Sequence, residues 1–389
     1  MVNLNTSIYK NISEDEIILT EQDIINTYDE RQQEQCRLYL EYFKIKEENP
    51  NFGYKRIAKL LGQKYDKTRW WHSGKHIPVP IQTVNWLKQK ELLPLTFSNP
   101  KLDVIARILG STFGDGGIFQ NLNAIFLSSS EMEALDEFAK DFTYLFGEQI
   151  QENSRIQESG EYGQSWHYDN TNRNVIRLFK ALGAPIGRKG EIELNIPRWI
   201  FKHIEIADEF FGALIGNEIG IPKVHINKNS LDTLSLGICA SPLFKENRHN
   251  FLNGLREYLT NKDIKSGKIS ECLSNKDENL VIYRLLLSVE FENVLNFLTL
   301  TKIRYCNYKQ KKLINTINEF GAIKKQRYTE LISQGYSQST ALSKIRINEA
   351  MLYVIENELP IPENFSEQNT QPIFNGGAQN DKLKFMDIR

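Results

Sequence analysis

Along the first hundred residues, apolar side chains recur at helical spacing in short blocks that turn signals separate. The pattern predicts four helices, over residues 31–48, 54–61, 66–72 and 82–90. Gly62 lies in the short turn between the second helix and the third, and Ser73-Gly74 ends the third. A helix, a tight turn and a short polar helix are typical of a helix-turn-helix unit. The sequence therefore predicts such a unit near the N-terminus.

From residue 101 onward, one order of elements occurs twice: helix, two strands, helix, two strands, helix. In the first copy these elements are expected at 101–115, 118–120, 124–128, 131–146, 149–157, 165–168 and 172–182. In the second copy they are expected at 207–218, 223–227, 233–239, 242–259, 265–273, 281–289 and 291–302. The sequence thus predicts an α+β fold in which an αββαββα unit is duplicated, behind an N-terminal helical domain.

At 389 residues, the chain is longer than one hydrophobic core usually organises. The expected parts are a flexible acidic arm (1–30), a helix-turn-helix domain (31–98), two αββαββα subdomains (101–198 and 199–312), a basic helical extension (313–360) and a disordered tail (361–389). No apolar run approaches the roughly 18–20 residues of a membrane span. The N-terminus lacks the pattern of a signal peptide, and the four scattered cysteines form no CxxC pair. An intracellular location is expected.

The net charge of −1 hides a strong segregation of charge along the chain. Residues 31–100 carry thirteen Lys/Arg against six Asp/Glu, and residues 301–350 carry ten against three. Contact with phosphates depends on such local fields rather than on the sum over the chain. In the predicted helix-turn-helix unit, four side chains are candidate DNA contacts: Lys67, Thr68, Arg69 and Lys75.

The helix expected at 101–115 ends in an unusual combination of glycines and an acid. Gly110 and Gly114, four residues apart, form a notch where a second helix can approach closely. Asp115 follows at the C-terminal end of the helix, where the helix dipole disfavours a carboxylate. An acid at an unfavourable position indicates a chemical role, such as binding of a metal ion.

A comparable stretch follows over residues 207–226. In one register, Ala213 is the small residue of the helix and Glu218, five positions later, is the acid. In the other register, the glycines of the two stretches align and Asn217 takes the acid position, where an amide would abolish metal-dependent cleavage. We prefer the Glu218 register because the flanking apolar residues and the following strand fit it better, although Ile219 stands where the first stretch has a glycine.

These two stretches resemble the LAGLIDADG motif of homing endonucleases, and the resemblance covers about residues 101–312. The phrases at 183–200 and 302–312 are also similar to phrases in archaeal members, and the N-terminal helix-turn-helix resembles one often found ahead of this module. The resemblance implies that the two motif helices pack at a central axis. It places the two acids, Asp115 and Glu218, side by side as the candidate catalytic residues and metal ligands. Gly114 and Asn217 would lie beside them at the metal, and Lys223 would be a catalytic residue at the periphery of the site.

The function implied by this resemblance is a monomeric endonuclease that uses Mg²⁺ or Mn²⁺ to cut both strands of double-stranded DNA. The two sheets would form a saddle over the duplex. Two alternatives stay open: a catalytically inactive transcriptional regulator, as in the WhiA sporulation-regulator family, and an intron maturase that binds intron RNA. The retained acids favour the endonuclease, whereas Ile219 and the basic helices favour the regulator. An intein is disfavoured, because the chain begins with Met1 and does not end in His-Asn.

Overall fold

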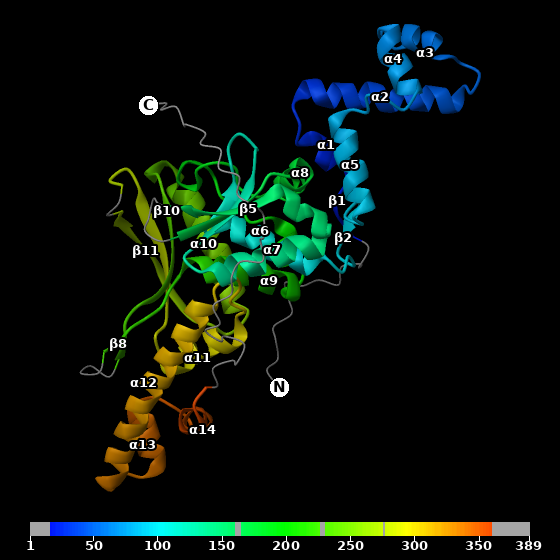
Figure 1. The fold of residues 1–389 in the computed structure, drawn as a ribbon. Helices are drawn as coiled ribbons and strands as arrows, with labels where there is room; N and C mark the ends of the chain where they lie inside the picture. The colour runs from blue at the N-terminus through cyan, green and yellow to red at the C-terminus, as the bar shows by residue number, and fades with distance from the viewer. Residues whose placement is uncertain (1–15, 160–164, 226–229, 275–276, 360–389) are drawn as a thin grey trace.

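The computed structural model describes residues 16–159, 165–225, 230–274 and 277–359. These residues form a central region of helices and two four-stranded antiparallel sheets, from which two further groups of helices project (Figure 1). The chain is therefore a mixture of helix and sheet, as the sequence predicts. The tail expected at 361–389 and the first fifteen residues of the expected arm lie outside the described ranges. No helix of the described residues is long and apolar enough to cross a membrane.

The first half of the central region contains the expected order of elements. Its elements are α6 (Leu102–Phe113), β3 (Gly116–Ile118), β4 (Ile125–Ser129), α7 (Met132–Phe146), β5 (Ser154–Ser159), β6 (Ser165–Asn170) and α8 (Arg173–Ala181). The strands form a sheet in the order β3-β4-β6-β5. The strand expected at 149–157 begins later than predicted, because a 3-10 turn over Glu148–Asn153 comes first. Gln151 fixes this turn on α7 by donating to the Ala139 carbonyl over 2.9 Å.

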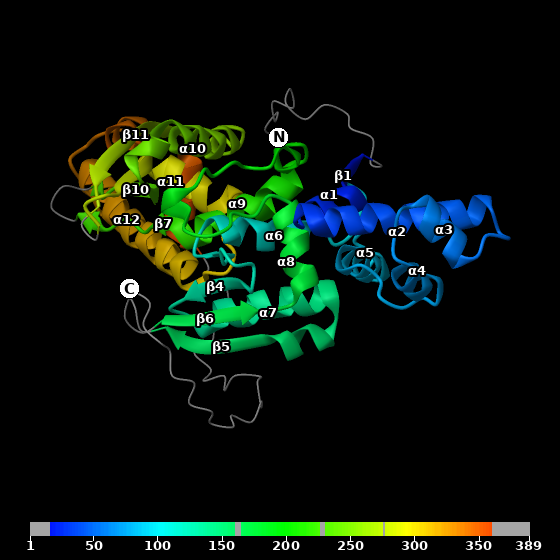
Figure 2. The same ribbon diagram turned by 90° about the horizontal axis from the view of Figure 1, so that it is seen from above.

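The second half has the same sheet order, β7-β10-β12-β11. Its elements are α9 (Ile204–Glu218), β7 (Ile219–Gly220), β10 (Leu234–Ala240), α10 (Lys245–Thr260), β11 (Ser266–Leu273), β12 (Val281–Leu287) and α11 (Phe291–Leu300). In β10 every second residue is buried, as expected for a strand with one face on the core. Figure 2 shows the two sheets on either side of α6 and α9.

Of the strand expected at 223–227, Val224 and His225 form the short strand β8, which does not belong to the four-stranded sheet, and residues 226 and 227 lie outside the described ranges. The short strand β7 takes its place beside β10, pairing Ile219 with Leu236. Pro222, which has no N–H to donate to a ladder, follows β7 closely. The chain then leaves the sheet and forms a separate two-stranded ribbon, in which β8 (Val224–His225) pairs with β9 (Ser230–Leu231).

Helices α6 and α9 lie against each other at the centre of the molecule, but their glycines have different partners. A Cβ on Gly110 would clash with the Phe210 carbonyl of α9, so the α6 notch does admit the second helix. On α9, a Cβ on Gly212 or Gly216 would instead clash with the backbone of residues 302–304. The α9 glycines therefore accommodate the segment that follows α11, and only the α6 glycines serve the contact between the two helices.

The N-terminal region forms helices over all four expected segments. Its elements are β1 (Ile17–Leu19), α1 (Glu21–Asn26), α2 (Glu30–Glu48), α3 (Tyr54–Leu60), α4 (Tyr65–His72), α5 (Val79–Gln89) and β2 (Leu95–Thr96). Leu38, Tyr42, Ile57 and Trp71 give α2, α3 and α4 a small core of their own, and these helices project to one side (Figures 1 and 2). The expected flexible arm is wrong for its described part, because β1 pairs with β2 and Ile24 of α1 is fully buried.

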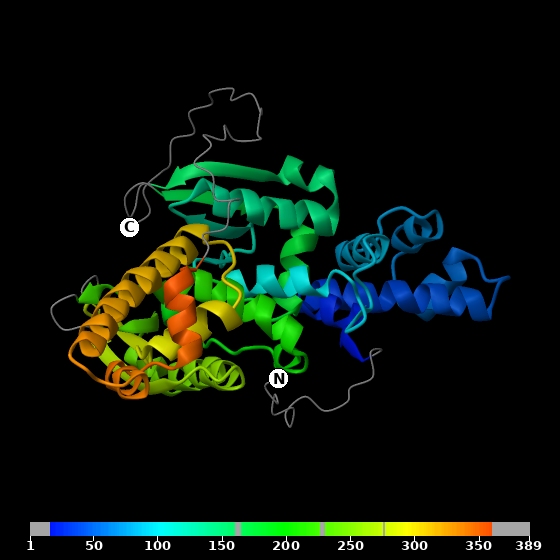
Figure 3. The same cartoon turned by 90° about the horizontal axis from the view of Figure 1, so that it is seen from below.

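The basic extension expected at 313–360 is helical. It consists of α12 (Asn307–Ser333), α13 (Gln338–Ile345) and α14 (Glu349–Asn357). Figure 3 shows α12 running from the central region with α13 and α14 folded back against it. Lys324 anchors this fold, since its buried ammonium donates to the Ile345 carbonyl over 2.8 Å.

Candidate active site and nucleic-acid interface

Asp115 and Glu218 lie at the ends of the two central helices and face one cavity. Helix α6 ends at Phe113, and Asp115 lies in the link to β3; Glu218 is the last residue of α9. Both acids line a cavity of about 860 Å³ whose walls include Phe126 of the first sheet and Gly237 of the second. Each of the two motifs therefore places one carboxylate at the floor of a groove between the sheets.

The contact between Gly114 and Asn217 decides which residue of the second motif faces Asp115. A Cβ on Gly114 would clash with the Asn217 side chain, which fills the space that the glycine leaves. The Asn217 amide donates to the Ser111 carbonyl over 3.3 Å and so is turned toward α6. Gly114 and Asp115 thus lie opposite Asn217 and Glu218, the residues 103 positions later in each case. This contact is the one that the Glu218 register predicts.

Both carboxyl groups hold protons more tightly than usual. Burial raises the pKa of Asp115, against the opposing charges of Lys309 and Lys189. Burial and then repulsion by Asp115 raise the pKa of Glu218 to about 7. The Asp115 side chain still reaches solvent in the groove. A divalent cation would relieve the repulsion between two such carboxylates.

Two lysines complete this cluster, and each follows the last helix of its half. Lys189, eight residues after the end of α8, donates to the Gly116 carbonyl over 2.7 Å. Lys309, nine residues after the end of α11, donates to the Asn217 carbonyl. Burial lowers the pKa of Lys189, and the charges of Glu218 and Asp115 oppose this. Lys309 also lines a second cavity, of about 130 Å³, which shares Asp115 with the larger one.

Lys223 does not join these residues. It is exposed at the start of the β8–β9 ribbon, and its carbonyl accepts from the Asp232 amide over 2.8 Å. The residues that line the groove include Lys189 but not Lys223. Lys189 and Lys309 lie in the phrases at 183–200 and 302–312, so the sequence did contain a signal for them. That signal was their position after the last helix of each half.

The groove face of the first sheet carries a polar cluster centred on Asp169 of β6. The Asp169 carboxylate lies 3.1 Å from the Arg155 guanidinium and 2.8 Å from Nε2 of His167. The His167 ring stacks on Phe126, whose ring stacks in turn on Phe119. A buried carboxylate thus orients a mostly exposed arginine beside a column of stacked rings.

The residues proposed from sequence on α4 are not equivalent in the structure. Thr68 is fully buried and donates to the Tyr65 carbonyl over 3.0 Å, so the prediction that it contacts DNA is wrong. Lys67 is half-buried and donates to Gln63 over 3.0 Å. Arg69 and Lys75 are exposed and lie 5.8 Å and 5.5 Å from the ring of Trp70, itself 36% exposed.

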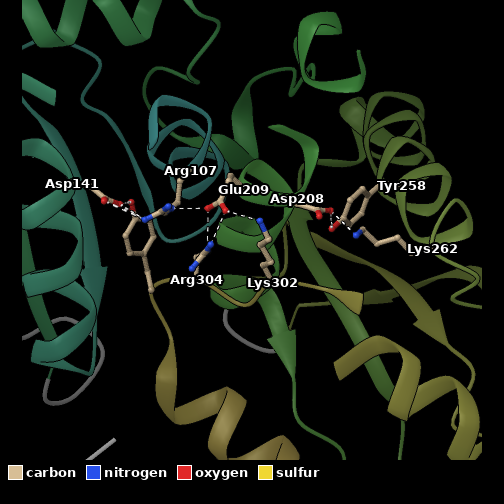
Figure 4. A network of polar contacts seen from close by, with 9 residues as sticks. Arg107, Asp141, Asp208, Glu209, Tyr258, Lys262, Lys302 and Arg304 are labelled. Atoms are coloured by element: carbon tan, nitrogen blue, oxygen red, sulfur yellow. Dashed lines mark hydrogen bonds and ion pairs between the residues drawn. The ribbon is translucent and has the colours of Figure 1, made fainter. Parts of the chain in front are cut away.

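An ion network joins the two halves near the middle of α6 and α9 (Figure 4). Glu209 of α9 is 3% exposed and accepts from Arg107 of α6 over 2.7 Å. It also accepts from Arg304 over 2.6 Å and from Lys302 over 3.1 Å. Arg107 continues to Asp141 of α7 over 3.1 Å. The network therefore ties both central helices to the segment that leads to Lys309.

No model of a known protein family matches the chain. The DNA-directed RNA polymerase subunit Rpo1N of Methanocaldococcus jannaschii is 30% identical over 189 residues, which cover 45% of this chain and 14% of that protein. The tRNA-splicing ligase RtcB of Pyrococcus furiosus is 28% identical over 312 residues, 73% of this chain and 31% of that protein. The replication factor C small subunit of M. jannaschii is 23% identical, over 67% of this chain and 14% of that protein. The chain spans less than a third of the length of these relatives.

Among solved structures, the chain is similar to the homing endonuclease I-DmoI. A mesophilic variant of I-DmoI aligns with a TM-score of 0.33 and 12% identity, over 51% of this chain and 89% of that chain. A structure of I-DmoI with its target DNA and manganese aligns with a TM-score of 0.34 and 11% identity, over 52% of this chain and 95% of that chain.

Proposed function

We propose that the chain is a metal-dependent endonuclease that cuts both strands of a long, specific site in double-stranded DNA. The observation that carries this proposal is the convergence of Asp115 and Glu218, each with a lysine nearby, at the floor of a groove between two sheets of the same strand order. One acid for each strand accounts for double-strand cleavage by a single site. Because one chain contains both halves, it acts as a monomer.

The acid pair fits Mg²⁺ or Mn²⁺. Mg²⁺ is commonly bound by one or two carboxylates together with substrate phosphates, and keeps its remaining waters. Among the described residues, no three His, Cys, Asp or Glu side chains converge, so a closed structural metal site is not what this donor set offers. Gly114 lines the same groove, whereas the Asn217 side-chain amide is turned to the Ser111 carbonyl and its backbone carbonyl already accepts from Lys309. Asp115 and Glu218 are therefore the proposed metal ligands.

The chemistry that a bound divalent cation supplies is activation of water and stabilisation of the leaving oxygen of a phosphodiester. Asp115 and Glu218 would hold the cation at the floor of the groove. The ammonium groups of Lys189 and Lys309 offer positive charge beside the acids, where charge accumulates on the phosphate in the transition state. The groove faces of both sheets would contact the bases, with Arg155 of the first sheet suited to guanine.

The relatives differ from one another: they are a polymerase subunit, a tRNA-splicing ligase and a replication factor subunit. The chain matches less than a third of each of these proteins. So small a part of each protein does not carry the activity that its name states. We therefore do not transfer ligation or polymerisation to this chain.

The test is selection of cleaved duplexes from a randomised DNA library in Mg²⁺ or Mn²⁺. We expect double-strand breaks within one long sequence, and none when EDTA removes the metal. Specific binding without metal-dependent cleavage would replace this proposal with the inactive regulator. Preferential binding of structured intron RNA over duplex DNA would replace it with the maturase.

The exposed cluster of Arg69, Trp70 and Lys75 provides a second DNA contact, outside the groove. We expect the double variant Arg69→Gln/Lys75→Gln to weaken binding of the selected duplex about tenfold and to reduce the slope of log affinity against log salt by about 2, because two phosphate contacts are lost. The matched control is Arg37→Gln on α2, since Arg37 is exposed but paired with Glu34 and Glu41. An unchanged slope would exclude phosphate contact by this cluster.

Metal affinity should depend on pH near neutrality. A cation binds the charged carboxylates, and the pKa of Glu218 is raised to about 7. We expect Mn²⁺ affinity, measured by calorimetry, to fall about tenfold per pH unit below pH 7. Without metal, the folded state holds this proton more tightly than the unfolded chain does, so stability should fall as pH rises from about 4.5 to 7. Constant affinity down to pH 5.5 would contradict the raised pKa.

A further inference from the structure

Arg248 of α10 is a fully buried arginine whose hydrogen bonds go to uncharged oxygens. Its guanidinium donates to the Lys189 carbonyl, to the Ile192 carbonyl over 2.7 Å and to the side-chain oxygen of Asn247. Burial lowers the pKa of Arg248 to about 10. Burying a guanidinium is costly unless its donors are satisfied. Two of the acceptors here belong to the loop that carries Lys189.

Residues 189–194 of this loop are bound to the second half of the molecule, whereas Pro185 and Gly187 exchange hydrogen bonds with Ile118 of β3 in the first half. Gly190 accepts from the Ser241 amide over 2.9 Å, just after β10. Leu194 donates its amide to Asn247 over 2.8 Å. The ammonium of Lys189, by contrast, donates to Gly116 in the first half. Lys189 is thus held at its backbone by one half and at its tip by the other.

Lys309 is held by different contacts. The Arg304 amide, five residues before it, donates to the Gly212 carbonyl over 3.1 Å, and the Arg304 side chain binds Glu209. The Tyr308 amide donates to Glu131 over 3.3 Å. No described contact of Arg248 reaches this segment. A change at Arg248 therefore loosens one lysine of the site and leaves the other in place.

We propose that Arg248 is a positioning residue that fixes Lys189 beside the acids, so that its loss slows cleavage of one DNA strand more than cleavage of the other. The proposal rests on the proposed endonuclease function. In the groove, Lys189 lies with Glu218 and Asp115, whereas Lys309 and Asp115 share the smaller cavity. The two lysines thus occupy two sides of the acid pair, which matches one lysine for each scissile phosphate.

The experiment follows a supercoiled plasmid that carries the selected target site, with Arg248→Met, Arg248→Lys and the wild type. The wild type should convert supercoiled DNA to linear DNA with little nicked intermediate. In Arg248→Met we expect the second cut to slow about 10- to 100-fold, as for a misplaced catalytic group, so that nicked circles accumulate. Arg248→Lys keeps one donor and should restore part of the rate. Binding of the duplex without metal should stay within about threefold, because Arg248 is buried away from DNA.

The matched control is Arg256→Met. Arg256 lies on the same helix and also donates to a backbone carbonyl, that of Gly267 on β11, over 2.8 Å. It should keep the wild-type ratio of the two strand rates. Equal slowing of both strands in Arg248→Met, or the same ratio as in Arg256→Met, would overturn the positioning role. If Arg248→Met melts below the assay temperature, the strand ratio of Arg248→Lys decides in its place. Absence of any metal-dependent cut by the wild type would instead reject the endonuclease function, and this proposal with it.

Discussion

Asp115→Asn and Glu218→Gln should each lower the rate of double-strand cleavage at least about 1,000-fold while leaving binding of the duplex intact. Each change keeps the size of the side chain but removes a charged metal ligand. The wild-type acids repel each other and the phosphates, so the variants should bind DNA without metal at least as well as the wild type. The measurement is cleavage of the selected duplex in Mg²⁺ beside binding by fluorescence anisotropy.

Asn217→Asp provides the matched control for the second motif. Asn217 is turned toward α6 and binds the Ser111 carbonyl, so an acid at that position should not replace Glu218. We expect the double variant Asn217→Asp/Glu218→Gln to remain inactive. Restored cleavage would mean that the Asn217 register describes the working site. Full activity in Asp115→Asn would remove the acid pair from the mechanism altogether.

The duplicated order of elements could be predicted from the sequence because each half repeats the same alternation of helical and strand periodicity. Asp115 stood out for a related reason, since a carboxylate at a helix C-terminus is unfavourable without a chemical role. The second acid was harder to place. The glycines of α9 suggested a contact with α6, whereas they accommodate the segment at 302–304. Periodicity shows that a helix has a small-residue face but does not show which neighbour fills it.

Lys189 and Lys309 could not be found by periodicity, because helical or strand spacing does not show which side chains face the acids; Lys189 begins a 3-10 turn and Lys309 lies in the first turn of α12. Their placement depends on tertiary contacts with Gly116 and Asn217, which the local sequence does not encode. Thr68 was misplaced for the opposite reason. Its polarity suggested exposure, whereas its hydroxyl donates within its own helix and lets the side chain be buried.

The acid pair lies at the C-terminal ends of α6 and α9 and the ion network near the middle of the same two helices, and the two groups have opposite effects on stability. Burial of Asp115 and Glu218 outweighs the charges of Lys189 and Lys309, and the raised pKa values of the two acids mean that the folded state disfavours their charged forms. Near the middle of the helices, Glu209 has three cationic partners, and its pKa is lowered by hydrogen bonds and charge from Arg304 and Arg107 despite burial. The network thus holds together two helices whose acidic C-terminal ends repel.

Glu209→Gln should therefore destabilise the fold by about 3 kcal/mol, because removing one member of a buried ion pair leaves the other charges uncompensated. The estimate lies at the low end for such changes because Lys302 and Arg304 are 46% and 29% exposed and can turn to solvent. Urea unfolding without metal gives the free energy of unfolding directly.

The matched control is Glu290→Gln. The partner of Glu290, Lys265, is 3.7 Å away and exposed, so this change should lower the free energy of unfolding by less than about 0.5 kcal/mol. Equal effects of the two changes would mean that the network does not hold α6 and α9 together. If Glu209→Gln lost much stability but cleaved DNA normally below its melting temperature, Glu209 would have a role in folding alone, because Lys309 would then be positioned correctly without the Glu209 charge.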